Sequence, residues 1–494
     1  MQRDMDTTYA PRTGRAAPGP EHSTDAQLAA ILDSAAAAAR RTADATPEER
    51  RQWLDAVANA LEKETDRLVG IADEETALGV PRLTGELAKA AENARFYGRA
   101  GQRGEWLRAR IERLPNGPEL RRAQLPIGPV AVFGASNFPF QFGTIGHDTC
   151  SALAAGCPVV VKAHPAHPRL AATVANLVMR ALDEAGAPKG IFGNVVGFDA
   201  GPVLVRSPQI AAVAFTGSQT GGMALVEAAR RRPVPIPVYA EMGTVNPAVV
   251  TPAAEAAAEL VAAGFVDSFT LGVGQFCTKP GLLLVPAGST IPHAVAELVR
   301  VRDGGWMLTE DIASRYRVGL AQLRAAGAEV LAQGWLPTAG YAAQPAVLSV
   351  PAEALRDNDS RLREECFGPA ALVVTYQDVD DAVSLLEVLQ PSLAGSVFSG
   401  GPDDPDVLRL VQTLAAQVGR VTVDEWPTGV ACNSVIQHGG PWPATSIPTA
   451  SSVGAAALER FTRPVCFQNI PEEALPPALQ DANPWFLPER EVSW

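Results

Sequence analysis

The chain has 494 residues, of which 47% are hydrophobic and 19% are charged, and its formal net charge is −13. This length exceeds the usual size of one hydrophobic core, so we expect two or three globular domains, and the negative charge opposes general binding to nucleic acid or to an anionic membrane. The six cysteines lack the close pairing of a disulfide framework or a zinc site, and no run of about 18 strongly apolar residues suggests a membrane span, so we expect a soluble cytoplasmic protein with reduced thiols.

The N-terminal region is predicted to begin with a flexible tail. Residues 1–22 mix charged residues with proline and glycine, and they lack the apolar stretch of a secretory signal. From about residue 24 the apolar residues recur with a helical period, and Thr46, Pro47 and Glu49 form a helix start with a capping box. We therefore expect a helical layer after the tail.

A turn sequence follows the helical layer. The residues Pro115-Asn-Gly-Pro118 interrupt the segment 108–124 and predict two short strands joined as a hairpin. Such a hairpin can serve as an arm in an oligomer interface, and a plain surface hairpin is an equal alternative.

Two series of short β-rich segments occupy most of the remaining chain. In the first series the predicted strands alternate with helical stretches at 143–155 and 170–185. This alternation is typical of a parallel, doubly wound sheet, and a second series after residue 241 predicts a second α/β domain. The predicted strands are 129–134, 158–162 and 210–215 in the first series, and 247–250, 281–285, 371–374 and 419–423 in the second.

Cys277 and Glu241 have surroundings that fit catalysis. Cys277 lies in the loop-like segment 272–281, with glycines before it and a proline after it. A lone cysteine is more commonly a buried hydrophobe, but a thiolate held on such a loop is a nucleophile. Glu241 ends an apolar strand-like run just before Gly243, and it is either an exposed strand-end carboxylate or a general base whose pKa is raised by burial.

Several other candidates also follow predicted strands. Asn137 follows the first one, where open α/β sheets bind their ligands, and its amide could donate to an oxyanion or merely cap the turn. The segment 215–222 opens a helix, where backbone amides can meet a pyrophosphate, although it lacks the GxGxxG spacing. Lys162 could reach a ribose hydroxyl or a phosphate, or it could be an ordinary solvated lysine. His164 and His167 are interleaved with prolines and have no further ligands nearby in the sequence, so we predict no metal site.

Taken together, these segments resemble the aldehyde dehydrogenase family from about residue 25 to about residue 470. The resemblance rests on the order in which Asn-Phe-Pro, the strand-end lysine, Phe-Thr-Gly-Ser, Glu-Met-Gly, Gly-Gln-Phe-Cys and Glu-Glu-Cys-Phe-Gly-Pro occur. It implies an α/β fold with a Rossmann-like cofactor domain at 23–106 and 127–240, and an α/β catalytic domain at 241–467. It also implies a β-hairpin oligomerisation arm at 107–126 and 468–494, and a homodimer or homotetramer.

The same resemblance implies a role for each residue of the site. It makes Cys277 the nucleophile that forms a thioester, Asn137 with the backbone amide of Cys277 the oxyanion hole, and Glu241 the base for deacylation. It places Glu365 and Phe367 at the nicotinamide ribose. The residues that it assigns to the rest of the dinucleotide site are Lys162, Gly217, Ser218 and Gly222.

Details in five segments resemble one branch of the family, the 2,5-dioxovalerate (α-ketoglutaric semialdehyde) dehydrogenases. This branch implies NAD(P)-dependent oxidation of 2,5-dioxovalerate to 2-oxoglutarate. The carboxylate at the far end of that substrate should meet an arginine or a helix N-terminus, which the sequence does not identify. The segments are 74–79, 82–87, 141–148, 427–430 and 438–446.

Two positions depart from the family pattern. Many NAD-preferring relatives have an acidic residue three positions after the strand-end lysine, where this chain has Pro165. That change removes a partner of the ribose hydroxyls and a repulsion against a 2′-phosphate, so NADP is favoured, while NAD stays open because no arginine is assignable to the phosphate. The second departure is Thr244, where most relatives have a second glycine.

Three alternatives to this function remain. One is an NADP-dependent dehydrogenase of long-chain fatty aldehydes, which shares the Asn-Phe-Pro segment. Another is a noncatalytic protein on the same fold, which the joint presence of Cys277, Glu241 and Asn137 opposes. A third is acyl transfer to coenzyme A, and the presence of Glu241 favours hydrolysis over it.

Overall fold

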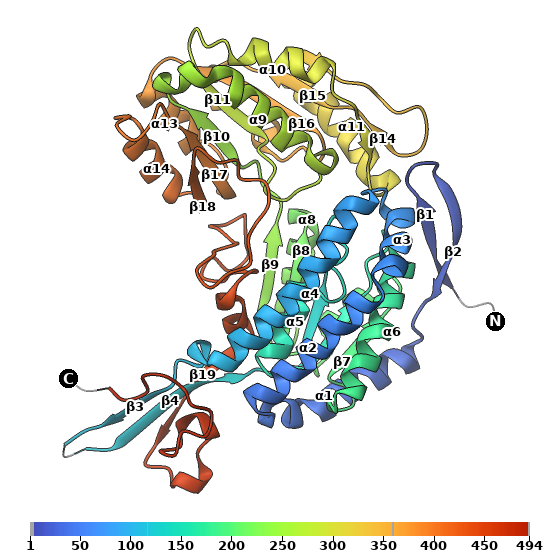
Figure 1. Ribbon diagram of the computed structural model, residues 1–494, viewed down its shortest axis with the longest axis vertical. Helices are drawn as coiled ribbons and strands as arrows, with labels where there is room; N and C mark the ends of the chain where they lie inside the picture. The colour runs from blue at the N-terminus through green and yellow to red at the C-terminus, as the bar shows by residue number, and fades with distance from the viewer. Residues whose placement is uncertain (1–3, 116, 358–359, 493–494) are drawn as a thin grey trace.

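The computed structural model describes residues 4–115, 117–357 and 360–492. Two β-sheets, each covered by helices, form the bulk of the molecule, and a narrow three-stranded arm projects from it (Figure 1). The predicted α/β fold is confirmed. The boundaries between domains stay predictions, apart from the differences given below.

The first sheet is parallel and is buried on both faces. Its strands are β5 (Val130–Phe133), β6 (Val159–Lys162), β7 (Phe192–Val195), β8 (Ala212–Gly217) and β9 (Val238–Met242), in the order β7-β6-β5-β8-β9. Its helices are α1 (Asp25–Asp44), α2 (Pro47–Lys63), α3 (Thr65–Thr76), α4 (Val80–Arg103), α5 (His147–Ala154), α6 (Pro168–Glu184), α7 (Ala200–Arg206) and α8 (Gln219–Arg230). One face packs against α2 to α6 and the other against α1, α7 and α8, which explains the nearly continuous valine and alanine runs of the central strands.

The second sheet has seven strands, and all pairs are parallel except that of β13 with β15. Its strands, in spatial order, are β13 (Glu329–Gln333), β15 (Ala346–Ser349), β16 (Ala370–Tyr376), β11 (Leu282–Pro286), β10 (Pro247–Val250), β17 (Ser392–Phe398) and β18 (Val418–Val423). Its helices are α9 (Ala258–Thr270), α10 (Ile291–Arg300), α11 (Glu310–Ala325), α12 (Ala352–Arg356), α13 (Val379–Glu387) and α14 (Val407–Ala415). Helices α9 and α10 cover one face and α11 to α14 the other.

The predicted flexible tail is wrong for the residues that the structure describes. Strands β1 (Met5–Ala10) and β2 (Arg15–Glu21) pair as an antiparallel hairpin. Tertiary contacts hold it in place, since Thr8 Oγ1 donates to Glu75 Oε1 at 2.5 Å and Arg12 forms an ion pair with Asp73 at 2.8 Å. These partners lie on α3, more than 60 positions away, so the local composition does not reveal them.

The arm is an antiparallel sheet made from two distant parts of the chain. Strands β3 (Arg110–Arg113) and β4 (Glu119–Pro126) form the predicted hairpin, whose turn residue Asn116 lies outside the described residues. Strand β19 (Thr462–Gln468) pairs with β4. Residues 462–467, which we predicted in the catalytic domain, therefore belong to the arm.

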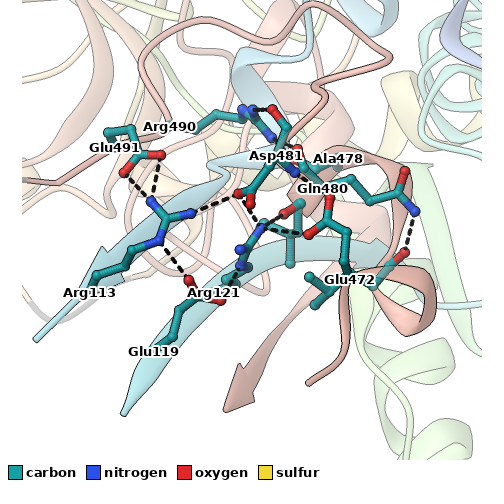
Figure 2. A network of polar contacts seen from close by, with 11 residues as sticks. Arg113, Glu119, Arg121, Glu472, Ala478, Gln480, Asp481, Arg490 and Glu491 are labelled. Atoms are coloured by element: carbon teal, nitrogen blue, oxygen red, sulfur yellow. Dashed lines mark hydrogen bonds and ion pairs between the residues drawn. The ribbon is translucent and has the colours of Figure 1, made fainter. Parts of the chain in front are cut away.

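The C-terminal segment packs along the outer side of the arm. The backbone of Ile111 in β3 donates to Arg490 O at 2.7 Å and accepts from Val492 N at 2.9 Å. Figure 2 shows the polar network behind this contact, in which Arg121 of β4 lies within 3.4 Å of Glu119, Glu472 and Asp481. Side chains of the C-terminal segment thus bind the strands of the arm.

One helical stretch, Pro252–Gly274, is long and apolar enough by composition to cross a membrane. Within it, α9 places Phe265 and Phe269 in the core against the second sheet, while Leu260 is 78% exposed. A helix with one buried and one open face is what a layer of an α/β domain requires, and the end of α9 leads directly to the loop of Cys277.

Candidate active site

The C-terminal end of β9 carries Glu241 and is covered by a segment that follows β18. Glu241 forms an antiparallel bridge with Thr445, and Met242 N donates to Ala444 O at 2.9 Å. This pairing runs the segment 438–454 along the end of the first sheet. It brings His438 next to Glu241.

The loop that carries Cys277 is built by two unusual backbone positions. Helix α9 is followed by the short turn η3 (Leu271–Gly274), in which Gly272 has φ +57° and Val273 has φ +60°. A side chain at Gly272 would lie 2.5 Å from the guanidinium of Arg82, so glycine is needed there. Asn246 Nδ2 then donates to Cys277 O at 2.8 Å, which fixes the loop against the second sheet.

Cys277, His438 and Glu241 form a compact trio. Cys277 Sγ lies 3.7 Å from His438 Nε2, and the same nitrogen lies 3.0 Å from Glu241 Oε1. Ser452 Oγ donates to the other oxygen of Glu241 at 2.5 Å. His438 and Glu241 have side chains only 1% and 2% exposed, whereas Cys277 is partly open.

The electrostatics of the trio oppose a free thiolate. Burial and the negative charge of Glu241 raise the pKa of the Cys277 thiol well above its ordinary value. Burial by itself would raise the pKa of Glu241 as well, but contacts with His438 and Ser452 outweigh it and lower that pKa. The expectation that burial raises the pKa of Glu241 is therefore wrong, because a buried imidazole and a hydroxyl stabilise the carboxylate.

Asn137 lies in the turn after β5 and faces the same loop. Its Nδ2 donates to Gln275 O at 2.8 Å, two residues before Cys277, and Arg82 donates to Asn137 O at 2.7 Å. Buried Glu86 accepts hydrogen bonds from the backbone amides of 140–141 and thereby holds the rest of the turn. The amide group of Asn137 is thus fixed beside the thiol loop.

The predicted segment from Gly217 to Gly222 joins β8 to α8. Ser218 is the N-cap residue of α8, and its Oγ accepts from Gly221 N at 3.2 Å. Gly222 lies against β9, since a Cβ there would come within 2.7 Å of Met242 Sδ. The glycine at this position allows the helix to approach the strand closely.

Glu365 lies just before β16 and reaches the end of the first sheet. A Cβ at Gly243 would come within 2.0 Å of Glu365 Oε2, and Gly243 N donates to Gly217 O at 3.1 Å. The other oxygen, Oε1, is buried without a hydrogen-bond partner among the described residues. Burial raises the pKa of Glu365 to about 7, against the opposing charge of Lys279. Phe367 is half-buried two residues further on.

Lys162 ends β6 and lies near the N-terminal hairpin. Its side chain is only 8% exposed; burial lowers its pKa, and the charge of Asp6 opposes that shift. Asp6 Oδ1 lies 2.9 Å from His22 Nε2, whereas Oδ2 is buried and has no hydrogen-bond partner in the described parts of the chain.

Some residues of the site were not assigned a role from the sequence. Asn246 and Asp6 gave no local signal, and His438 appeared only within a segment of the branch resemblance. His438 is 161 positions from Cys277 and 197 from Glu241, so only the folded chain brings them together.

Comparisons with known proteins identify the family of the chain. The sequence model of the aldehyde dehydrogenase family matches residues 2–464. Alpha-ketoglutaric semialdehyde dehydrogenase 2 of Azospirillum brasilense is 42% identical over 453 residues, covering 89% of this chain and 86% of its own. Alpha-ketoglutaric semialdehyde dehydrogenase of Acinetobacter baylyi is 39% identical, covering 90% of this chain and 86% of its own.

Solved structures show the same fold. An NAD-dependent aldehyde dehydrogenase from Sinorhizobium meliloti superposes with a TM-score of 0.82 at 22% identity, covering 95% of this chain and 92% of its own. An NADP dependent enzyme of E. coli gives a TM-score of 0.80 at 23% identity, covering 94% of each chain. With a family match over most of its length, the chain belongs to the aldehyde dehydrogenase family.

Proposed function

We propose that this protein oxidises 2,5-dioxovalerate to 2-oxoglutarate through a thioester on Cys277. The observation that carries the chemistry is the trio of Cys277, His438 and Glu241 beside Asn137. The substrate is inferred from the two relatives at 42% and 39% identity, which are named for this semialdehyde. NAD(P), when bound, supplies the acceptor for the hydride that leaves the substrate.

Each residue of the trio has a task in this proposal. Because burial and Glu241 disfavour the thiolate, the thiol needs a base when it attacks, and His438 Nε2 lies 3.7 Å from the sulfur. Asn137 Nδ2 and the backbone amide of Cys277 donate to the oxyanion that forms on the carbonyl oxygen. Glu241 stabilises the protonated imidazole, and in the second half-reaction it accepts the proton of the water that hydrolyses the thioester.

The predicted cofactor residues fit a dinucleotide. Glu365 offers a buried carboxylate oxygen without a partner among the described residues, as a ribose hydroxyl requires. Gly217 and Gly243 carry no side chain that would cover the backbone near Glu365. A side chain at Gly243 would collide with the Glu365 carboxylate. Lys162 presents an ammonium group that has no hydrogen bond within the described chain. We therefore assign the nicotinamide ribose to Glu365 and the adenosine end to Lys162.

The preference between NADP and NAD depends on what lies beside Lys162. Pro165 removes the acidic residue that repels a 2′-phosphate in many NAD-preferring relatives, which favours NADP. Asp6 of the N-terminal hairpin brings a carboxylate back to this place from another part of the chain. We propose that the protein uses both cofactors and that Asp6 limits its use of NADP.

Arg420 of β18 is our candidate for the distal carboxylate of the substrate. Its Nη2 donates to Gly429 O at 2.7 Å, and Gly429 N donates to Thr278 Oγ1 at 3.0 Å, which ties the residue to the loop of Cys277. Burial lowers the pKa of Arg420, and the charge of Cys277 opposes that shift, so the two groups lie within electrostatic range of each other. Its Nε is a buried donor without a hydrogen-bond partner in the described residues, so it is available to donate to an anionic ligand.

We also propose a homodimer or homotetramer in the cytoplasm, assembled through the arm. Residues 490–492 cover the edge of the arm sheet at β3. The other edge strand, β19, has only exposed and half-buried residues. An edge strand of this kind can pair with another chain.

A spectrophotometric assay of cofactor reduction tests the function. We expect turnover of 2,5-dioxovalerate with NAD or NADP, 2-oxoglutarate as the product with or without coenzyme A, and no turnover in Cys277→Ala. If the protein oxidises a long-chain aldehyde and not the semialdehyde, the substrate assignment is wrong and the thioester mechanism stands. An acyl-coenzyme A product would overturn hydrolysis, and no turnover with any aldehyde would favour a noncatalytic protein.

A further inference from the structure

The trio of Cys277, His438 and Glu241 also has the composition of a zinc site. It combines a thiol, an imidazole and a carboxylate, whose ligand atoms all lie within 4.8 Å of one another. Soft sulfur and imidazole ligands prefer zinc or cobalt to magnesium or calcium. Three protein ligands with one open position are typical of zinc sites that keep a water molecule.

Two of the three separations between ligand atoms are close to those around a single tetrahedral ion. With a zinc–sulfur bond of about 2.3 Å and zinc–nitrogen and zinc–oxygen bonds of about 2.0 Å, a tetrahedral angle puts sulfur and nitrogen about 3.5 Å apart and nitrogen and oxygen about 3.3 Å apart. The observed separations are 3.7 Å for Cys277 Sγ to His438 Nε2 and 3.0 Å for His438 Nε2 to Glu241 Oε1. These two pairs need shifts of only a few tenths of an ångström, and the Cys277 sulfur and the Glu241 carboxylate lie within 4.8 Å of each other.

Charge and support around the trio favour a divalent cation. A thiolate, a carboxylate and a neutral imidazole sum to two negative charges, so Zn²⁺ would leave this largely buried group neutral. Ser452 Oγ donates to Glu241 Oε2 at 2.5 Å and orients the carboxylate, as groups behind metal ligands do. Among the described residues, this is the one group of three or more such side chains close enough to share an ion.

We propose that Zn²⁺ binds Cys277, His438 and Glu241 and reversibly inhibits the enzyme. Binding forms a zinc–sulfur bond and releases the thiol proton to solvent, and no atom is oxidised or reduced. The sulfur lone pair that would attack the aldehyde is then held by the metal. A chelator should restore activity, and Mg²⁺ should not inhibit.

Cobalt absorption gives a direct test that needs no aldehyde. Chelator-treated protein titrated with Co²⁺ should gain thiolate-to-cobalt charge-transfer absorption that saturates at one ion per chain, and Zn²⁺ should abolish it. Cys277→Ser should remove the band and His438→Gln should weaken cobalt binding at least about tenfold. Cys466→Ser and His293→Gln are matched controls, since both residues are exposed and lie away from the trio, and neither should change the titration. A band that survives in Cys277→Ser, or no band at all, overturns the proposal.

Alkylation of the unaltered protein provides a second measurement, independent of whether the variants fold. Zn²⁺ should slow the reaction of iodoacetamide with Cys277, followed by peptide mass spectrometry, and leave the exposed Cys466 unprotected. Equal rates at Cys277 with and without zinc contradict the site. Neither measurement uses substrate. A protein that binds cobalt at this site but does not oxidise 2,5-dioxovalerate would therefore contradict the proposed function and leave the zinc site supported. A protein that oxidises 2,5-dioxovalerate but binds no cobalt would contradict the zinc site and leave the proposed function supported.

Discussion

At the scale of single residues, the proposed mechanism makes His438 the base that takes the thiol proton. The Cys277 sulfur lies beside a carboxylate that disfavours its thiolate, and Nε2 of His438 is the near base. Replacing His438 by Gln should lower kcat roughly 100-fold, within the range of general base catalysis, with little change in KM. The variant should also slow alkylation of Cys277 in the absence of metal. A wild-type alkylation rate would show that another group takes the proton.

Arg420 should determine the preference for an anionic substrate. Replacing it by Met removes the charged donor, and hydrogen bonds to a charged group contribute about 1.5–3 kcal/mol, so kcat/KM for 2,5-dioxovalerate should fall roughly 10- to 100-fold. Pentanal is the matched substrate, because it has the same chain length and no carboxylate. Its kcat/KM should change only a few-fold. Equal losses on both substrates would mean that Arg420 only supports the loop at Gly429.

The residues of the site differ in how far the sequence could predict them. Cys277, Glu241 and Asn137 each end a strand or occupy a loop beside one, so strand patterns and the family resemblance place them. Asn246 and His438 act through contacts that cross 31 and 161 positions, and nothing in their neighbours indicates those partners. The pKa direction of Glu241 was wrong for the same reason, because it depends on His438.

At the scale of elements, many strands of the two sheets follow from local patterns, whereas the N-terminal hairpin does not. The predicted strands coincide with β5, β6, β8, β10, β11, β16 and β18, and most of these carry continuous apolar runs because they are buried on both faces. Strands β7, β13, β15 and β17 were not predicted. The hairpin has few apolar residues and depends on distant partners. Tyr341 N donates to Pro11 O at 2.8 Å at its tip, and Thr8 contacts α3 behind it.

The hairpin should influence the choice of cofactor through Asp6. Replacing Asp6 by Asn removes a negative charge next to Lys162, and relief of about 1 kcal/mol of repulsion corresponds to roughly a fivefold gain for a 2′-phosphate. The ratio of kcat/KM for NADP to that for NAD should rise accordingly. Calorimetric binding of 2′,5′-ADP and 5′-AMP separates this effect from turnover. Asp4→Asn changes the net charge by the same amount and is the control. It should leave unaltered both the ratio of kcat/KM for NADP to that for NAD and the relative binding of 2′,5′-ADP and 5′-AMP. An equal change in the two variants would exclude a local role for Asp6.

At the scale of the whole molecule, the fold class and the two sheets were predictable. The contacts that late segments of the chain make with much earlier strands were not. Residues 438–454 leave the second sheet and return to β9, and β19 joins the arm at β4. Local periodicity describes each element and says nothing about such returns. The boundary predicted at residue 467 was therefore placed too late by the length of most of β19.

The C-terminal segment and the arm should act together in assembly, and Arg121 is a buried arginine that joins them. Its side chain is 5% exposed and bridges Glu119, Glu472 and Asp481 (Figure 2), so Arg121→Ala removes the buried cation of this network and should destabilise the arm by roughly 2 kcal/mol. Arg113→Ala is the matched control, because Arg113 has similar partners but is 45% exposed, which limits its contribution to under about 1 kcal/mol. If the arm holds the oligomer, light scattering after size exclusion should show a lower mass for Arg121→Ala at dilution and the original mass for Arg113→Ala. A mass that stays the same in both variants, while thermal unfolding confirms the loosened arm, would place the interface elsewhere on the molecule.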